Sequence, residues 1–241
     1  FESIRTNVLP KLDYAKKTIR VWTAGCSTGE EVYSIAILVR EYLEVNKIDC
    51  DVKLFATDID TTAIEIAGEG FYPDNLVADV DASLLYKYFV KKEGGYKVAD
   101  SVRKLVVFAK HNILKDPPFS KLDMIVCRNL FIYLKSENQL SILTGFYYSL
   151  SPNGFLFLGS SESLGDISKG FKIVDAKWKI YQYREGYSPS IPNTVIYPNT
   201  KIGRRFKPET EMQQIHPAMR LVLHLLFFVN TFLNFIFPKV N

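Results

Sequence analysis

A strand–loop–helix–strand unit near the start of the chain limits its fold more than any other feature. Two short apolar runs, residues 19–25 (IRVWTAG) and 52–58 (VKLFATD), each end in turn residues. Between them, residues 30–45 carry apolar side chains at helical spacing, and the small residues 27–29 supply natural capping chemistry. A βαβ unit of this kind joins parallel strands through a right-handed crossover. The sequence therefore predicts an α/β fold with a parallel sheet.

The α/β pattern continues along the chain with one interruption. Residues 61–70 begin the next helix, with Thr61 or Thr62 as its cap. Residues 84–108 instead indicate a short helix and a hairpin that turns at Gly94-Gly95, which predicts a small antiparallel insertion. The remaining expected elements are a buried parallel strand at 123–129, a helix at 136–150 with Ser136 as its N-cap, and an antiparallel edge hairpin at 171–184.

The loop after the first strand, GCSTG at residues 25–29, is compatible with several kinds of site. A phosphate-binding P-loop needs a lysine after its last glycine, whereas Glu30 and Glu31 follow here and would repel a triphosphate. The Gly-x-Ser-x-Gly pattern also matches a hydrolase nucleophile elbow. That elbow follows a central strand and needs a downstream histidine, but this loop follows the first strand and two of the three histidines lie in the C-terminal tail.

Asp58 ends the second strand, where dinucleotide-binding folds place an acid that accepts the ribose hydroxyls. The full glycine pattern of those folds is missing, because only Gly25 and Gly29 are present. S-adenosylmethionine has a ribose but no pyrophosphate, and its cationic groups tolerate nearby acids. Alternatively, Asp58 caps the next helix and the two glycines only make a tight turn. Their occurrence on one βαβ unit favours the cofactor.

Two later segments place polar residues at the same predicted edge of the sheet. Cys127, Arg128 and Asn129 end the strand at 123–129, and Asn112 follows another strand with an amide suited to an adenine edge. Ligands of open α/β sheets bind outside the carboxyl ends of the strands. One polar residue at a strand end is usually structural, but three converging strand ends favour a binding site.

Composition narrows the classes of function. The length of 241 residues suits one α/β domain, and a net charge of +4 is far from the basic stripe of a nucleic-acid-binding protein. Cys26, Cys50 and Cys127 are widely spaced, which predicts reduced thiols in a cytoplasmic compartment and no metal site. No signal peptide opens the chain, and its first residues are typical of a fragment of a longer protein.

Residues 186–241 are expected to form a linker and an apolar tail after a domain of residues 1–185. The segment 219–237 is about as long as a short membrane-spanning helix. A polar stripe that includes His224 and Asn234 predicts instead an amphipathic helix that packs on a partner or on the domain. Membrane contact is the alternative, which the stripe disfavours.

The chain resembles the CheR-type chemotaxis receptor methyltransferases over about residues 1–185, with matching segments in the same order. The resemblance implies a Rossmann-like class I methyltransferase sheet with helices on both faces and a small antiparallel β-subdomain. It also implies S-adenosylmethionine-dependent methylation of glutamate side chains on chemoreceptor signalling helices, which gives glutamate methyl esters and S-adenosylhomocysteine. The segments that carry it are VWTAGCSTGEEVYSIA (21–36), FATDIDTTAIEIAGEGFY (55–72), HNIL (111–114) with PPFSKLDMIVCRNLFIYL (117–134), and LSPNGFLFLGSSESLG (150–165).

The resemblance also implies which residues form the site. The loop from Ala24 to Glu31 would line the methionine end, Asp58 would bind the ribose, and Arg128 and Tyr133 would face the substrate glutamate. Asn112 and Ile113 would flank the adenine. The implied cofactor-binding residues are Ala24, Gly25, Cys26, Ser27, Gly29, Glu30, Glu31, Asp58, Asn112, Ile113, Cys127 and Arg128.

Two departures from the family pattern affect these expectations. The N-terminal helical domain of the family and its Thr-x-Phe-Phe-Arg stretch are absent, so the pocket is expected to be incomplete. The module looks closest to those fused with methylesterase and sensory domains, and the short turn at 91–97 favours an enzyme that needs no receptor tether.

A glutamate nucleophile has a reference pKa of ~4.3 and needs no general base at neutral pH. The alternative function is a non-catalytic signalling module that binds S-adenosylmethionine or S-adenosylhomocysteine.

Overall fold

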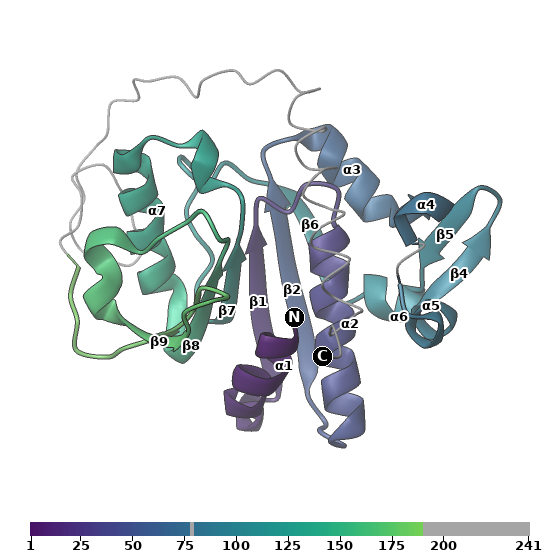
Figure 1. Ribbon diagram of the computed structural model, residues 1–241, viewed down its shortest axis with the longest axis horizontal. Helices are drawn as coiled ribbons and strands as arrows, with labels where there is room; N and C mark the ends of the chain where they lie inside the picture. The colour runs from purple at the N-terminus through teal and green to yellow at the C-terminus, as the bar shows by residue number, and fades with distance from the viewer. Residues whose placement is uncertain (78–79, 190–241) are drawn as a thin grey trace.

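The computed structural model describes residues 1–77 and 80–189. Figure 1 shows a large sheet between helices, with a small sheet set to one side. The strands are β1 (Thr18–Ala24), β2 (Asp51–Asp58), β3 (Phe71–Pro73), β4 (Phe89–Lys92), β5 (Gly95–Val98), β6 (Val106–Lys110), β7 (Leu122–Cys127), β8 (Leu150–Leu158), β9 (Phe171–Asp175) and β10 (Ile180–Tyr183). The α-helices are α1 (Glu2–Asn7), α2 (Glu30–Val45), α3 (Thr61–Glu69), α4 (Asp74–Val77), α5 (Ala82–Tyr88), α6 (Asp100–Arg103) and α7 (Ser136–Ser149).

Within the described residues, the large sheet has seven strands in the order β6-β2-β1-β7-β8-β10-β9. β1 pairs in parallel with β2 on one side and β7 on the other, and β10 runs antiparallel to β8 and β9. The chain therefore builds outward from β1 to one edge and then crosses to the other side of β1. This confirms the predicted Rossmann-like α/β sheet and places its switch point, where ligands bind, at the carboxyl ends of β1 and its neighbours.

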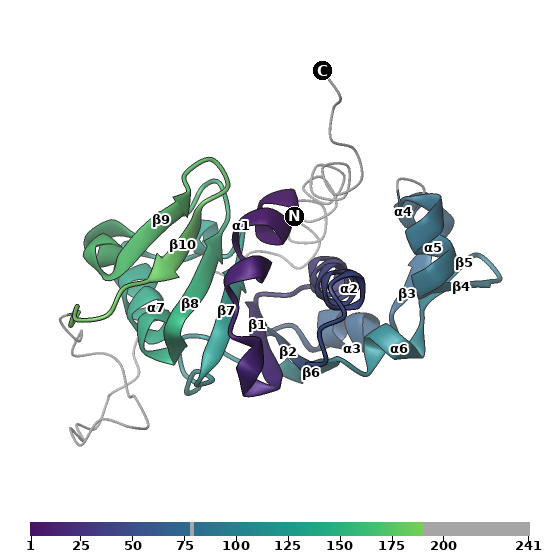
Figure 2. The same cartoon turned by 90° about the horizontal axis from the view of Figure 1, so that it is seen from below.

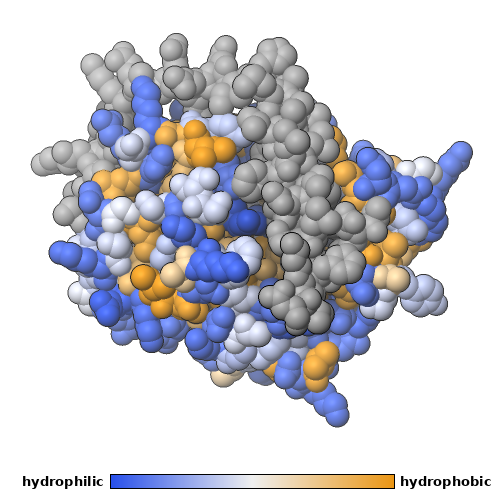
Figure 3. Space-filling model, viewed as in Figure 1, coloured by the Kyte–Doolittle hydropathy of each residue, from blue (hydrophilic) through white to orange (hydrophobic). Residues whose placement is uncertain are grey.

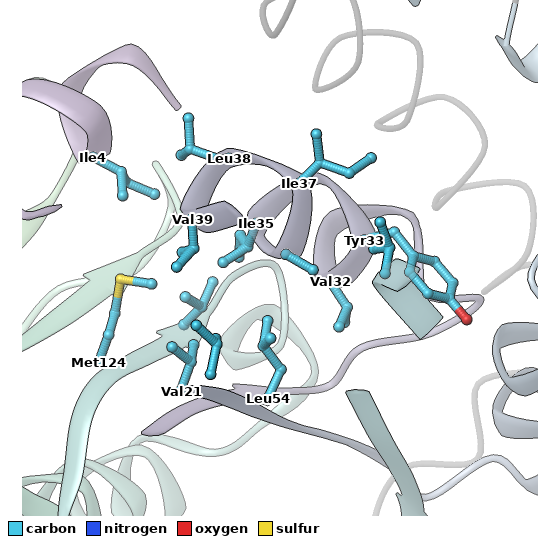
Figure 4. Close-up of a cluster of buried hydrophobic side chains, with 14 of the residues drawn as sticks. Ile4, Val21, Val32, Tyr33, Ile35, Ile37, Leu38, Val39, Leu54 and Met124 are labelled. Carbon is cyan, nitrogen blue, oxygen red and sulfur yellow. The ribbon is translucent and has the colours of Figure 1, made fainter. Parts of the chain in front are cut away.

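Alternate side chains of the central strands pack into two separate cores. Figure 2 shows α1 and α2 on the same side of the large sheet. Val21 and Leu54 point toward α2 in the cluster that also contains Ile4 of α1 (Figure 4). Trp22 lies on the opposite face, where its ring meets Phe146 of α7 edge-on at 5.4 Å between centroids. Because both faces are covered, every residue of β7 is buried, which explains its near-continuous apolar sequence.

The structure corrects the predicted caps of two helices. Asp60, rather than Thr61 or Thr62, caps α3: its Oδ1 accepts from the backbone N–H groups of Thr62 and Ala63 at 2.9 and 3.3 Å. Asp60 precedes the first helical residue, so its carboxylate reaches the exposed N–H groups better than a threonine inside the turn. Ser136 is the first residue of α7, and no side chain caps that helix.

The small antiparallel sheet is present, but its limits differ from those expected. β4 and β5 form the predicted hairpin around Gly94 and Gly95, and β3 adds a third strand beside β5. β6 pairs with β2 in the large sheet. The insertion therefore spans about residues 71–103 rather than 84–108. β3 has three residues, and a strand of this length is too short to show an alternating apolar and polar pattern in the sequence.

Packing against the domain extends to Pro189, just beyond the expected boundary at residue 185. The hydroxyl of Tyr147 donates to the carbonyl of Tyr187 at 2.6 Å, and the hydroxyl of Tyr148 donates to that of Pro189 at 3.4 Å. The rest of the expected linker and tail, with the segment 219–237, lies outside the described residues. Among residues 1–77 and 80–189, no helix has both the length and the apolar character needed to cross a membrane.

Candidate functional site

The loop between β1 and α2 is tied to the end of β2. The backbone N–H groups of Gly25 and Cys26 both donate to the carbonyl of Thr57, at 2.8 and 2.9 Å. Gly29 precedes α2 with a φ of 92°, and no side chain caps the helix. The N-cap therefore lies within the expected residues 27–29, but it is Gly29 and no hydroxyl takes part: the hydroxyl of Thr28 donates to the carboxylate of Glu30 at 2.6 Å.

Gly29 leaves no room for a side chain. A Cβ there would lie 2.9 Å from the Cβ of Ala67, on a backbone with positive φ. We expect Gly29→Ala to lower the free energy of unfolding by about 1–3 kcal/mol, measured by chemical denaturation. The matched control is Gly68→Ala in α3, where a Cβ meets nothing within 4 Å. That change is expected to raise the stability by about 0.5–1 kcal/mol, and equal effects of the two variants would contradict the steric argument.

Asp58 joins this loop to the turn after β2. Its Oδ2 accepts from the N–H of Ser27 and its Oδ1 from the N–H of Asp60, both at 3.0 Å. The residue is only 9% exposed. A carboxylate oxygen has two acceptor sites, so each oxygen keeps one for a further partner. Asp58 therefore holds the loop after β1 in place. The alternative interpretation, that Asp58 caps the next helix, is wrong because Asp60 caps it.

A pocket opens at the carboxyl ends of β1, β2 and β6. It combines an apolar wall with a few convergent polar groups, as a nucleoside site requires. Five of the predicted residues line it: Gly25, Asp58, Asn112, Ile113 and Tyr133. It is also lined by Thr57, Ile59, His111, Leu114, Leu130 and Leu134, which sequence reasoning missed although each lies close in sequence to a predicted residue.

Arg128 and Glu31 form an ion pair beside the loop. The Nη1–Oε1 distance is 2.5 Å, and the side chains are 15% and 20% exposed. The guanidinium lies over the ring of Phe157, 5.0 Å from its centroid. The Nε of Arg128 is buried and has no hydrogen-bond partner within the described part of the chain. The structure therefore fixes a positive group next to the loop and neutralises it with Glu31.

The two adjacent glutamates of α2 occupy different surroundings. Glu30 lines a second pocket together with Tyr72 of β3 and Leu84 of α5. Burial raises the pKa of the Glu30 carboxyl. This pocket lies between helices and the small sheet, not at the ends of parallel strands. Figure 3 shows hydrophobic surface where the part that carries the small sheet, at the right, meets the rest of the molecule. Glu31, which pairs with Arg128, is therefore the better candidate for contact with the cofactor.

The other predicted residues contribute little exposed surface. Ala24, Cys26 and Cys127 are 1%, 4% and 0% exposed, and none of them lines the strand-end pocket. Burial raises the pKa of both thiols, so neither is a thiolate nucleophile. Their part in cofactor binding, like that of Ser27 and Gly29, stays a prediction. Within residues 1–77 and 80–189, no group of His, Cys, Asp and Glu side chains could hold a metal ion.

A mostly parallel sheet with an acid at the end of its second strand and a pocket over its switch point defines the class of Rossmann-like proteins that bind a nucleoside cofactor. The chain belongs to a particular family of that class. The family model described as CheR methyltransferase, SAM binding domain, matches residues 1–180. This confirms the resemblance seen in the sequence, and the cofactor is S-adenosylmethionine.

Curated relatives agree with this assignment. The chain is 34% identical over 172 residues to a chemotaxis protein methyltransferase of Borreliella burgdorferi, covering 68% of this chain and 61% of the relative. It is 37% identical over 160 residues to chemotaxis protein methyltransferase 2 of Vibrio cholerae, covering 64% and 55%. It is 39% identical over 173 residues to an uncharacterized 104.1 kDa protein of Rhodobacter capsulatus, covering 71% and 18%. The chain thus spans less than two thirds of each of these relatives.

Proposed function

We propose that the protein transfers the methyl group of S-adenosylmethionine to glutamate side chains on the cytoplasmic signalling helices of chemoreceptors. The products are glutamate methyl esters and S-adenosylhomocysteine. The observation that carries the proposal is the strand-end pocket lined by Asp58, Asn112 and Tyr133 in a chain of this family. The names of the relatives, chemotaxis protein methyltransferases, support the biological setting. Fusion to methylesterase or sensory domains stays a prediction.

The chemistry of the pocket fits the cofactor. Asp58 has two remaining acceptor sites, which suit the two ribose hydroxyls. The Oδ1 of Asn112 accepts from the N–H of Leu114 at 3.0 Å, so its amide is held with the NH2 donors left for the adenine edge. The carboxylate of Glu31 lies at the start of α2 and suits the ammonium of the methionine end. In this arrangement, the nucleoside lies over β2 and β6 and the methyl donor lies toward Arg128.

The chain's task in the reaction is alignment rather than proton transfer. S-adenosylmethionine supplies an electrophilic methyl group on a sulfonium, and a glutamate carboxylate is ionised at neutral pH. Arg128 attracts and orients that carboxylate, and its pairing with Glu31 keeps it from holding the nucleophile too tightly. Tyr133 lines the strand-end pocket, where it positions the substrate beside the cofactor. Bringing the reacting atoms within about 3–3.5 Å and excluding water supplies the rate enhancement.

The test uses the full-length protein, methyl-labelled S-adenosylmethionine and a purified cytoplasmic fragment of a chemoreceptor. We expect label on the receptor that is released as methanol by mild alkali, because esters are saponified and N-methyl groups are not. Alkali-stable label would contradict the glutamate substrate. Binding of S-adenosylhomocysteine in calorimetry without any transfer would contradict the enzyme and support the non-catalytic signalling module. Absence of both binding and transfer would contradict both functions.

A further inference from the structure

A buried glutamate outside the pocket, Glu162, connects the ends of β7 and β8. It follows β8 and is 2% exposed. Its Oε1 accepts from the backbone N–H of Leu130 at 3.0 Å and from that of Phe131 at 3.4 Å. Leu130 lines the strand-end pocket, and Arg128 lies two residues before it. One carboxylate oxygen therefore holds the segment 128–131, which forms part of the pocket wall.

Residues 128–130 join β7 to a 3-10 helix, Phe131–Tyr133, whose first backbone N–H groups have no partner inside the helix. β7 ends at Cys127, and the backbone turns at Asn129 with a φ of 57°, a left-handed conformation. The N–H groups that follow face the protein interior, where a buried donor needs a partner. Glu162 supplies that partner from a position 32 residues away in sequence.

The space for this carboxylate is reserved by a glycine. A Cβ at Gly159 would overlap Oε2 of Glu162 and crowd the side chain of Asn129. Oε2 itself is buried and has no hydrogen-bond partner within the described part of the chain. Burial raises the pKa of the Glu162 carboxyl, and the hydrogen bonds from the backbone N–H groups of Phe131 and Leu130 oppose this, followed by the guanidinium of Arg128. A buried acceptor without a partner opposes stability, so packing alone does not explain a glutamate here.

We propose that Glu162 is a positioning residue: it fixes the segment 128–131 so that Arg128 and the Leu130 wall keep the geometry needed for methyl transfer. Glu162 is buried and does not line the pocket, so it acts through the segment and not on the substrate. This inference rests on the proposed function for its effect on catalysis. Its structural part, the restraint of the segment, is independent of that function.

Three variants of the full-length protein test the inference by activity. Glu162→Gln keeps the Oε1 acceptor, and we expect its kcat to stay within about threefold of the original. Glu162→Leu removes the acceptor at similar volume and is expected to lower kcat by about 100-fold, with a smaller change in KM for S-adenosylmethionine. Ser163→Ala, at the exposed neighbouring position, is the control and should leave both constants unchanged. Equal impairment of the Gln and Leu variants would overturn the proposal.

Amide hydrogen exchange provides a readout that does not require activity. In Glu162→Leu, the amides of Leu130 and Phe131 should exchange at least about 10-fold faster, and in Glu162→Gln they should exchange as in the original protein. If the original protein transfers no methyl group, the proposed function fails, and the exchange rates alone decide whether Glu162 restrains the segment. Unchanged exchange together with unchanged kcat in Glu162→Leu would overturn the inference.

Discussion

Asp58→Ala is expected to weaken the binding of S-adenosylhomocysteine by at least about 100-fold. Two hydrogen bonds from ribose hydroxyls to a charged, nearly buried carboxylate contribute about 1.5–3 kcal/mol each, and the variant loses both. The variant also releases the N–H of Ser27, which holds the loop after β1. Isothermal titration calorimetry measures the change in affinity, at a temperature well below the unfolding midpoint of the variant.

The matched control is Asp60→Ala. Asp60 lies two residues away and caps α3, but it does not line the pocket. Loss of the cap is expected to lower the stability by about 1 kcal/mol and to leave the affinity for S-adenosylhomocysteine unchanged. If Asp58→Ala binds as tightly as the original protein, or if both variants lose affinity equally, Asp58 has no specific role in cofactor binding.

Arg128→Ala is expected to reduce methyl transfer to the receptor fragment by about 100-fold in the full-length protein. The guanidinium is the positive group beside the loop, and without it the anionic substrate loses its orienting charge. Binding of S-adenosylhomocysteine should change by less than about 10-fold, because Arg128 does not line the strand-end pocket and acts on the methionine end through Glu31. Initial rates with saturating S-adenosylmethionine, together with calorimetry, separate these two effects.

Arg40→Ala serves as the control for loss of an arginine. Arg40 lies on α2, and its side chain donates to the carbonyl of Ser101 at 3.4 Å, in a different part of the molecule from the strand-end pocket. Its loss should change neither rate nor affinity. Full transfer activity in Arg128→Ala would show that the arginine only shapes the pocket, and the orienting role would then be wrong.

Much of the fold could be predicted from sequence because its signals are local. The helix expected at 30–45 is α2 with the same bounds, since a long amphipathic pattern between two strands has no competing interpretation. The apolar strand near 123–129 corresponds to β7, whose continuous burial leaves no polar face in its sequence. The ends of strands are also marked by local signals, because polar residues follow the apolar run. Asp58 and Asn112 could therefore be placed at one edge of the sheet.

The parallel sheet, its crossover and the edge at which polar residues converge follow from the order of the amino acids, because periodicity and strand ends are properties of neighbouring residues. Glu30 and Glu31 lie about 100° apart around the start of α2, and only the folded chain shows that their surroundings differ. The hydrogen bond from the N–H of Leu130 to Glu162, 32 residues away in sequence, is likewise seen only in the folded chain. Such contacts depend on which strands become neighbours in the sheet, and no local pattern carries that information.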